Sequence, residues 1–170
     1  MSRILFFVLA CFPVYLGAAS VDELERSVVR IIATLPGGFS TGSGSVLSPK
    51  LVLTNEHVVR NGRNIYVESN FSGGRKRANV LWQSTALDLA LLEVEAITVP
   101  AVILASEKPR KGDPVWALGY PGASDYSGMT FDATVNRGVV SNFHFVPWAG
   151  SGSSRRLNII QHDASINPGN

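Results

Sequence analysis

Short β-type runs separated by turn residues follow one another along most of this 170-residue chain. Breaks such as Pro36-Gly37-Gly38 and Asn61-Gly62 carry residues that favour turns. Helical signals are few: Ser20 followed by Glu23 matches a capping box and predicts one helical turn over residues 20–27. Regular strand spacing of this kind predicts an all-β barrel or sandwich. The predicted strands cover residues 28–33, 44–47, 51–54, 64–69, 76–82, 89–94, 115–119, 130–142 and 157–162.

The predicted strands divide into two groups of unequal completeness. Residues 96–111, which include Pro100 and Pro109, have the composition of a linker. We expect this linker to separate a complete first β-barrel over residues 20–95 from a second one over residues 112–170 that runs out of sequence. Without residues 1–19 the chain is long enough for one sizeable core.

The N-terminal segment 1–19 has the features of a signal peptide. Arg3 provides a small positive region, residues 4–16 are almost wholly apolar, and Gly17-Ala18-Ala19 offers small residues for cleavage. We therefore expect an exported protein, periplasmic or secreted. Two alternatives stay open: an uncleaved N-terminus that associates with the membrane, and lipidation at Cys11.

Charge and cysteine content exclude several classes of function. The formal net charge is +2, and it falls by one if the segment with Arg3 is removed, so nothing indicates a nucleic-acid partner. The basic runs Arg75-Lys76-Arg77 and Arg155-Arg156 lie among small polar residues and are typical of solvated loops. Cys11 is the only cysteine, so we expect no disulfide in the processed chain. No Cys and His residues stand at the spacing of metal ligands, so we expect no metal site.

One histidine and one aspartate are the candidate catalytic residues in the sequence. His57 follows a predicted strand that ends at Thr54, and Asp88 interrupts an apolar run between Leu87 and Leu89. Burying an unpaired carboxylate costs roughly several kcal/mol, so Asp88 should have a partner, and an imidazole N–H is a suitable one. From these residues alone, a structural histidine and an aspartate that caps a local turn remain equal alternatives.

The amino-acid sequences of six segments resemble those of the HtrA/Deg family of trypsin-like serine endopeptidases. Their order and spacing agree with that family from about residue 25 to the last residue. The six segments are residues 41–47, 53–59, 88–92, 117–122, 134–141 and 161–170.

The resemblance implies two six-stranded barrels with the active site in the cleft between them. It makes His57 the general base and Asp88 the acid that orients it. The nucleophilic serine would come directly after Asn170, in the order His…Asp…Ser, so the chain as given is expected to be inactive. Gly169 would supply one N–H of the oxyanion hole; without the resemblance it would be an ordinary turn glycine.

Three residues near the end of the chain would line the primary specificity pocket: Ser165, Ile166 and Asn167. Their apolar or neutral character favours small aliphatic side chains in the substrate. If instead the nearby Asp163 reached the pocket floor, Lys or Arg would be preferred.

The sequence thus predicts an exported HtrA-like serine endopeptidase of protein quality control or processing, which cleaves proteins or peptides through an acyl-enzyme. The resemblance implies no cofactor and no metal, and family analogy allows a homotrimer. Two alternatives remain: a non-catalytic member of the fold that binds peptides, and a truncated, inactive product. Intact His57 and Asp88 count against the binding module, which needs neither.

Overall fold

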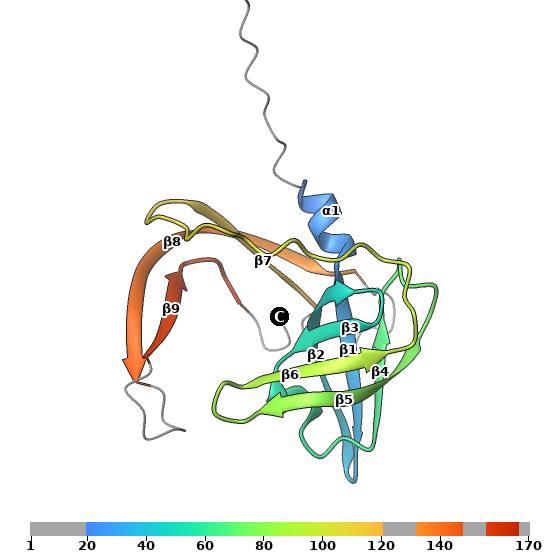
Figure 1. Ribbon diagram of the computed structural model, residues 1–170. Helices are drawn as coiled ribbons and strands as arrows, with labels where there is room; N and C mark the ends of the chain where they lie inside the picture. The colour runs from blue at the N-terminus through green and yellow to red at the C-terminus, as the bar shows by residue number, and fades with distance from the viewer. Residues whose placement is uncertain (1–19, 121–131, 148–155, 167–170) are drawn as a thin grey trace, which may run out of the picture.

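A computed structural model of the chain describes residues 20–120, 132–147 and 156–166. The predicted signal peptide 1–19 therefore lies outside the described residues. The elements, labelled in Figure 1, are α1 (Val21–Arg26), β1 (Val28–Leu35), β2 (Gly38–Ser48), β3 (Leu51–Thr54), α2 (Glu56–Val59), β4 (Asn64–Glu68), β5 (Lys76–Ser84), β6 (Leu89–Val94), β7 (Pro114–Gly119), β8 (Thr134–Pro147) and β9 (Arg156–His162).

The first six strands form a closed antiparallel barrel in the order β1-β2-β3-β6-β5-β4. β1 pairs with β2 along its whole length, and its other edge pairs with β4, which closes the barrel. Closure leaves no free sheet edge along β1, and it brings β3 and β6, which are distant in sequence, side by side. Those two strands lead into and out of the site described below.

The core of the molecule lies inside this barrel. Burying an aliphatic side chain of this size stabilises the folded state by about 1.5–3 kcal/mol relative to leaving it exposed, so this cluster supplies much of the stability. The cluster also takes in Ile97 and Val99, which follow the last barrel strand. Its other members are Val29, Ile31, Ala33, Val46, Val52, Val58, Val59, Ile65, Val67, Ala78, Ala90, Leu92 and Val94.

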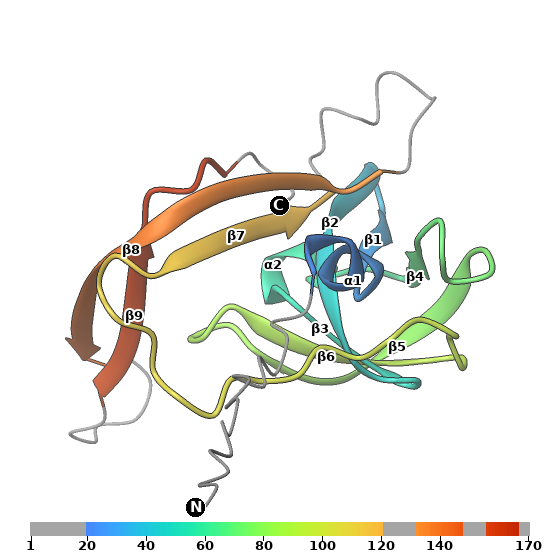
Figure 2. The same cartoon turned by 90° about the horizontal axis from the view of Figure 1, so that it is seen from above.

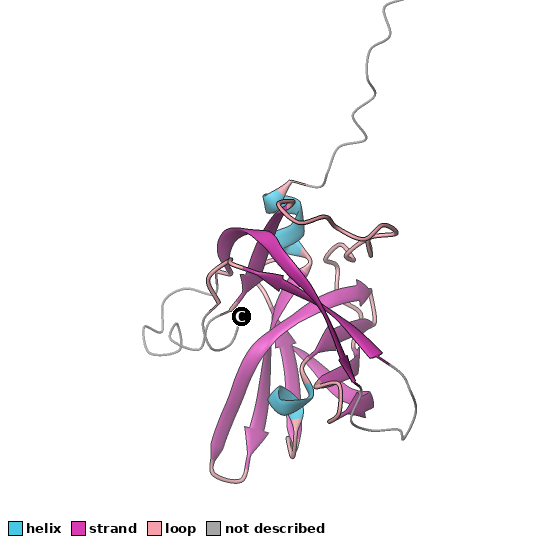
Figure 3. Cartoon of the chain, turned by 90° about the vertical axis from the view of Figure 1, so that its left-hand side faces the viewer, coloured by secondary structure: helices cyan, strands magenta, loops and turns pink. Residues whose placement is uncertain are grey.

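The remaining strands form a separate three-stranded antiparallel sheet in the order β7-β8-β9. Figure 2 shows this sheet arching beside the barrel, and Figure 3 shows it from its outer side. β7 contacts β1 and β2. At the end of β7, the backbone N–H of Tyr120 donates to Ser43 Oγ at 2.8 Å, and this bond joins the sheet to the barrel.

The predicted all-β class is confirmed, and most predicted strands are present. β3 and β6 have the predicted bounds, and the capping box at Ser20 and Glu23 is formed. β2 begins at Gly38, six residues before the predicted strand, because all of β1, from Val28 to Leu35, pairs with it. The predicted domain boundaries stay predictions, although β6 ends at Val94 and β7 begins at Pro114.

Within the parts of the chain that the structure describes, no helix has both the length and the apolar character that crossing a membrane requires.

Candidate active site

His57 lies on a short helix at the end of a barrel strand. β3 ends at Thr54, whose hydroxyl donates to the backbone carbonyl of Ser43 at 2.7 Å, and α2 begins two residues later. Val58 packs closely over Gly42 of β2: a Cβ added to that glycine would lie 2.6 Å from Val58 Cγ2. The absence of a side chain at Gly42 therefore lets α2 approach the barrel and places the imidazole at its rim.

Asp88 lies in the tight turn between β5 and β6. Its φ of 50° is in the left-handed region, which is uncommon for a residue other than glycine but is tolerated by aspartate. Its backbone N–H donates to the carbonyl of Thr85 at 3.3 Å. The pairing of β6 with β3 brings this turn next to α2.

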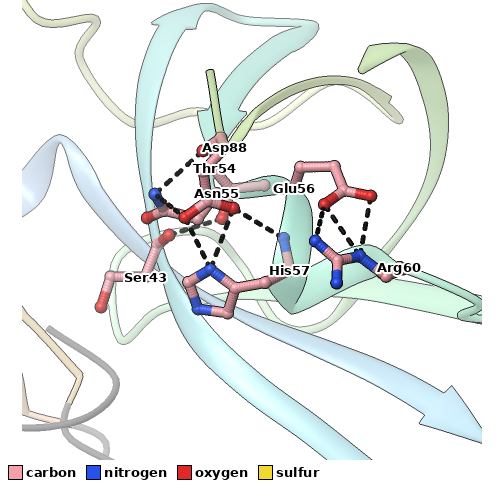
Figure 4. A network of polar contacts seen from close by, with 7 residues as sticks. All are labelled: Ser43, Thr54, Asn55, Glu56, His57, Arg60 and Asp88. Atoms are coloured by element: carbon pink, nitrogen blue, oxygen red, sulfur yellow. Dashed lines mark hydrogen bonds and ion pairs between the residues drawn. The ribbon is translucent and has the colours of Figure 1, made fainter. Parts of the chain in front are cut away.

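The two predicted residues meet in a compact hydrogen-bonded group (Figure 4). His57 Nδ1 lies 2.8 Å from Asp88 Oδ2 and 3.0 Å from Oδ1, and the His57 backbone N–H donates to Oδ1 at 2.9 Å. The Asn55 side-chain amide donates to Asp88 Oδ2 at 3.2 Å and to its backbone carbonyl at 3.0 Å. Four hydrogen-bonding contacts thus converge on one carboxylate.

These contacts set the charge of the pair. Partial burial alone would raise the pKa of Asp88, but hydrogen bonds from the His57 backbone and ring and from Asn55 outweigh it, so this pKa lies below its ordinary value. Asp88 is therefore ionised at neutral pH, and a neutral His57 carries its proton on Nδ1. The His57 side chain is 60% exposed, so Nε2 is accessible and can accept a proton from a hydroxyl group.

A second ion pair supports the same helix. Glu56 is buried, with 2% of its side chain exposed, and Arg60 Nε donates to both of its carboxylate oxygens at 2.9 and 3.1 Å. The hydrogen bond from Arg60 lowers the pKa of Glu56 against the opposing effect of burial. Sequence reasoning missed both this pair and Asn55. The four-residue spacing of Glu56 and Arg60 is the signal that could have found the pair.

Two of the predicted pocket residues, Ser165 and Ile166, lie in the segment that follows β9. Ser165 and Ile166 are exposed, with 57% of Ile166 accessible to solvent. Asn167 and Gly169 fall outside the described residues. The structure therefore brings His57 and Asp88 together and shows no contact between them and the described pocket residues.

The carboxylate of Asp163 is engaged with the backbone of β8. Its Oδ1 accepts the N–H of Val139 at 2.7 Å, and its own N–H donates to the Val139 carbonyl at 3.3 Å. Gly138 allows this arrangement, because a Cβ there would lie 2.2 Å from the backbone nitrogen of Ala164. These bonds hold the start of the segment that continues into Ser165.

A hollow of about 210 Å³ lies between the barrel and β7, next to Asn55. Side chains and backbone of β2, β3 and β7 line it, among them Ser43, Ser45, Leu53 and Leu118. Among the residues placed by the structure, no group of three His, Cys, Asp or Glu side chains could hold a metal ion.

Comparisons with known proteins identify a peptidase family. The trypsin-like peptidase domain matches residues 42–170. The chain is 35% identical to putative protease Do-like 3, mitochondrial, of Arabidopsis thaliana over 89% of its length, and 31% identical to serine protease Do-like HtrB of Bacillus subtilis over 90%. It spans only 28% and 37% of these two relatives.

Solved structures show the same architecture. The Rv3671c protease from M. tuberculosis in its active form superimposes with a TM-score of 0.74 at 27% identity, covering 88% of this chain and 64% of that one. The serine endoprotease from Yersinia pestis superimposes with a TM-score of 0.69 at 25% identity, covering 90% of this chain and 52% of that one.

Proposed function

The chain belongs to the trypsin-like peptidase family, among the Do-like, or HtrA, serine proteases, and from this premise we propose that it carries the acid–base half of a serine endopeptidase site. His57 is the general base in this proposal, and Asp88 orients it. The observation that carries the proposal is the contact of 2.8 Å between His57 Nδ1 and Asp88 Oδ2. The His57 side chain is 60% exposed, and Nε2 has no hydrogen-bond partner among the residues that the structure describes.

The proposed reaction uses a serine directly after Asn170, where the sequence resemblance implies the nucleophile. Its Oγ attacks a peptide carbonyl while its proton passes to His57 Nε2. The tetrahedral intermediate collapses as the imidazolium donates that proton to the leaving amine. Water, deprotonated by His57, then attacks the carbonyl carbon of the acyl-enzyme; the serine oxygen leaves, takes the proton back from His57, and the acyl product departs as a carboxylic acid. Asp88 stays ionised and stabilises the imidazolium, and the N–H of Gly169 would donate to the oxyanion.

The proposed substrates are proteins or peptides with a small aliphatic residue on the acyl side of the cleaved bond. Ser165 and Ile166 are neutral, which supports this preference. Asp163 is the acidic residue nearest to them, and its Oδ1 accepts a backbone N–H of β8. That bond argues against a preference for Lys or Arg.

Export and a role in protein quality control or processing complete the proposal. The apolar segment before Ser20 and the small residues at its end support export. An intact mass that corresponds to a chain starting at Ser20 or Val21 would support cleavage, whereas recovery of a chain starting at Met1 would favour a membrane anchor. The homotrimer allowed by family analogy stays a prediction.

Labelling with a fluorophosphonate tests the proposed reaction, because this probe reacts with an activated serine oxygen. A protein that continues through the residues after Asn170 should be labelled, and residues 1–170 alone should not. His57→Ala should lower the rate of labelling by roughly 10³-fold or more, as expected for loss of a triad member.

His144→Ala is the matched control, since His144 is exposed and bonded to Gln161 on the β8–β9 sheet. A longer protein that is folded but unlabelled would contradict the proposal and favour a non-catalytic peptide-binding role. Equal labelling of the His57→Ala and His144→Ala variants would contradict it as well.

A further inference from the structure

Asn55 occupies the N-cap position of α2 and does not cap it. Asparagine is among the residues preferred at this position, because its side-chain oxygen can accept a backbone N–H of the first helical turn. The backbone of Asn55 has the extended conformation of an N-cap, with φ −79° and ψ 144°, yet its side chain makes no capping hydrogen bond. Its amide group is used elsewhere.

Both hydrogen bonds from the Asn55 amide go to Asp88. One reaches the backbone carbonyl at 3.0 Å and the other reaches Oδ2 at 3.2 Å (Figure 4). The acceptor residue is 33 positions away and has a positive φ, so neither local sequence nor helix geometry requires these bonds. A single side chain therefore holds both the backbone and the carboxylate of the residue that contacts His57.

We propose that Asn55 is a positioning residue for His57, acting through Asp88, and this inference rests on the proposed function of that pair. Asp88 Oδ1 accepts the backbone N–H of His57, while Oδ2 lies 2.8 Å from the ring and also accepts the Asn55 amide. The amide stops the carboxylate from rotating away from the ring. The imidazole proton then stays on Nδ1, and Nε2 stays free to accept a proton.

The alternative role, as a simple helix cap, can be separated by the choice of substitution. Asn55→Ser keeps a side chain that caps helices well, adds no charge and removes the amide donor. A capping role predicts no change at His57, whereas a positioning role predicts a change. The charged groups around the pair, Glu56 and Arg60, are untouched by this substitution.

The matched control is Asn70→Ser. The Asn70 amide donates to Asp132 Oδ1 at 2.7 Å, so this variant loses the same kind of bond between asparagine and aspartate without touching Asp88 or His57. His144 and His162 serve as reference histidines within every sample.

The measurement is the nitrogen NMR spectrum of the histidine rings in the 170-residue chain, well above the ordinary histidine pKa of about 6.5. These spectra report which ring nitrogen carries the proton. In the unsubstituted chain and in Asn70→Ser, His57 should be mainly protonated on Nδ1. In Asn55→Ser the ratio of the Nδ1–H to the Nε2–H form should fall about fivefold or more, as expected for loss of one hydrogen bond of ordinary strength.

Asn55→Asp is a second variant. It also caps helices well and has nearly the same shape, but it replaces the donor with a carboxylate beside Asp88. We expect the ratio of the Nδ1–H to the Nε2–H form of His57 to fall in this variant as well, because the donor to Asp88 Oδ2 is lost.

The outcomes separate this inference from the proposed function. If the unsubstituted chain carries the His57 proton on Nε2, the proposed function of the His57–Asp88 pair is contradicted. If it carries the proton on Nδ1 and Asn55→Ser leaves the ratio unchanged, only the role of Asn55 is overturned. Unfolding of both Asn55 variants, with Asn70→Ser intact, would also overturn it in favour of a purely structural role.

Discussion

The closed barrel and the three-stranded sheet bury their apolar residues to very different degrees. In the barrel, Leu92 and Val52 are completely inaccessible to solvent, as befits a sheet whose edges all pair. In the sheet, Trp116, Ile159 and Ile160 are substantially exposed although they have the same apolar character. A closed barrel buries the inner face of its strands by itself, whereas an open three-stranded sheet buries a face only where another layer covers it.

This difference bears on the site, because His57 and Asp88 both belong to the closed barrel. Their contact joins α2, whose Val58 and Val59 belong to the barrel core, to the β5–β6 turn, which leads into Ala90 of the same core. The predicted pocket residues Ser165 and Ile166 follow the last strand of the open sheet. The contact between His57 and Asp88 therefore lies wholly within the barrel, while the predicted pocket residues Ser165 and Ile166 follow the sheet.

The largest expected contrast is in the response to loss of an aliphatic side chain. Leu92→Ala should lower the free energy of unfolding by about 2–5 kcal/mol, because it leaves a cavity in a packed core. Ile160→Ala, where 46% of the residue is already exposed, should lower it by about 1 kcal/mol or less. Urea unfolding followed by fluorescence measures both values. Equal losses would contradict the contrast between barrel and sheet.

Two glycines sharpen the comparison at the level of local structure. Gly42→Ala would press a methyl group against Val58, and Gly138→Ala would press one against the backbone of Ala164. Each should destabilise the protein by about 1–3 kcal/mol, with Gly138→Ala the costlier, since backbone atoms move less easily than a valine methyl. In NMR spectra, Gly42→Ala should shift the His57 resonances and Gly138→Ala should leave them in place. The reverse pattern would show that the sheet controls the pair.

The smallest expected effects are on the pH dependence of stability. Asp88 has a folded-state pKa below its unfolded value of about 3.8, so its contribution is complete above that value and disappears as the pH falls through the folded-state pKa. The contribution should be below about 1 kcal/mol, because 42% of the Asp88 side chain is exposed and solvent screens the pair. Asp88→Asn should therefore flatten the acid limb of the stability curve slightly.

Tyr120, at the junction of barrel and sheet, should act at the opposite end of the same curve. Burial raises the pKa of Tyr120 to about 12, so its contribution is complete below the unfolded value of about 10 and disappears as the pH rises through about 12. Unfolding measured across this range should show that Tyr120→Phe flattens the alkaline limb and leaves the acid limb unchanged. If Tyr120→Phe also altered the pH dependence of stability at acid pH, the contributions of Tyr120 and Asp88 would not be independent.

Most strands could be predicted from the sequence because neighbouring residues encode them. Residues 51–54 and 89–94 form strands with the predicted bounds, since short apolar runs bounded by turn residues need no distant partner to be recognised. The extension of β2 back to Gly38 could not be predicted, because the segment contains polar residues and glycines and becomes a strand only through its pairing with β1.

The order of segments and their family resemblance were enough to select His57 and Asp88 as partners 31 residues apart. Only the tertiary structure decided how they meet, because their distance depends on the closure of the barrel and on the pairing of β6 with β3. It also decided the role of Asn55. By its position that residue should cap α2, but the folded barrel places a carboxylate and a carbonyl within reach of its amide, and these acceptors replace the local bond.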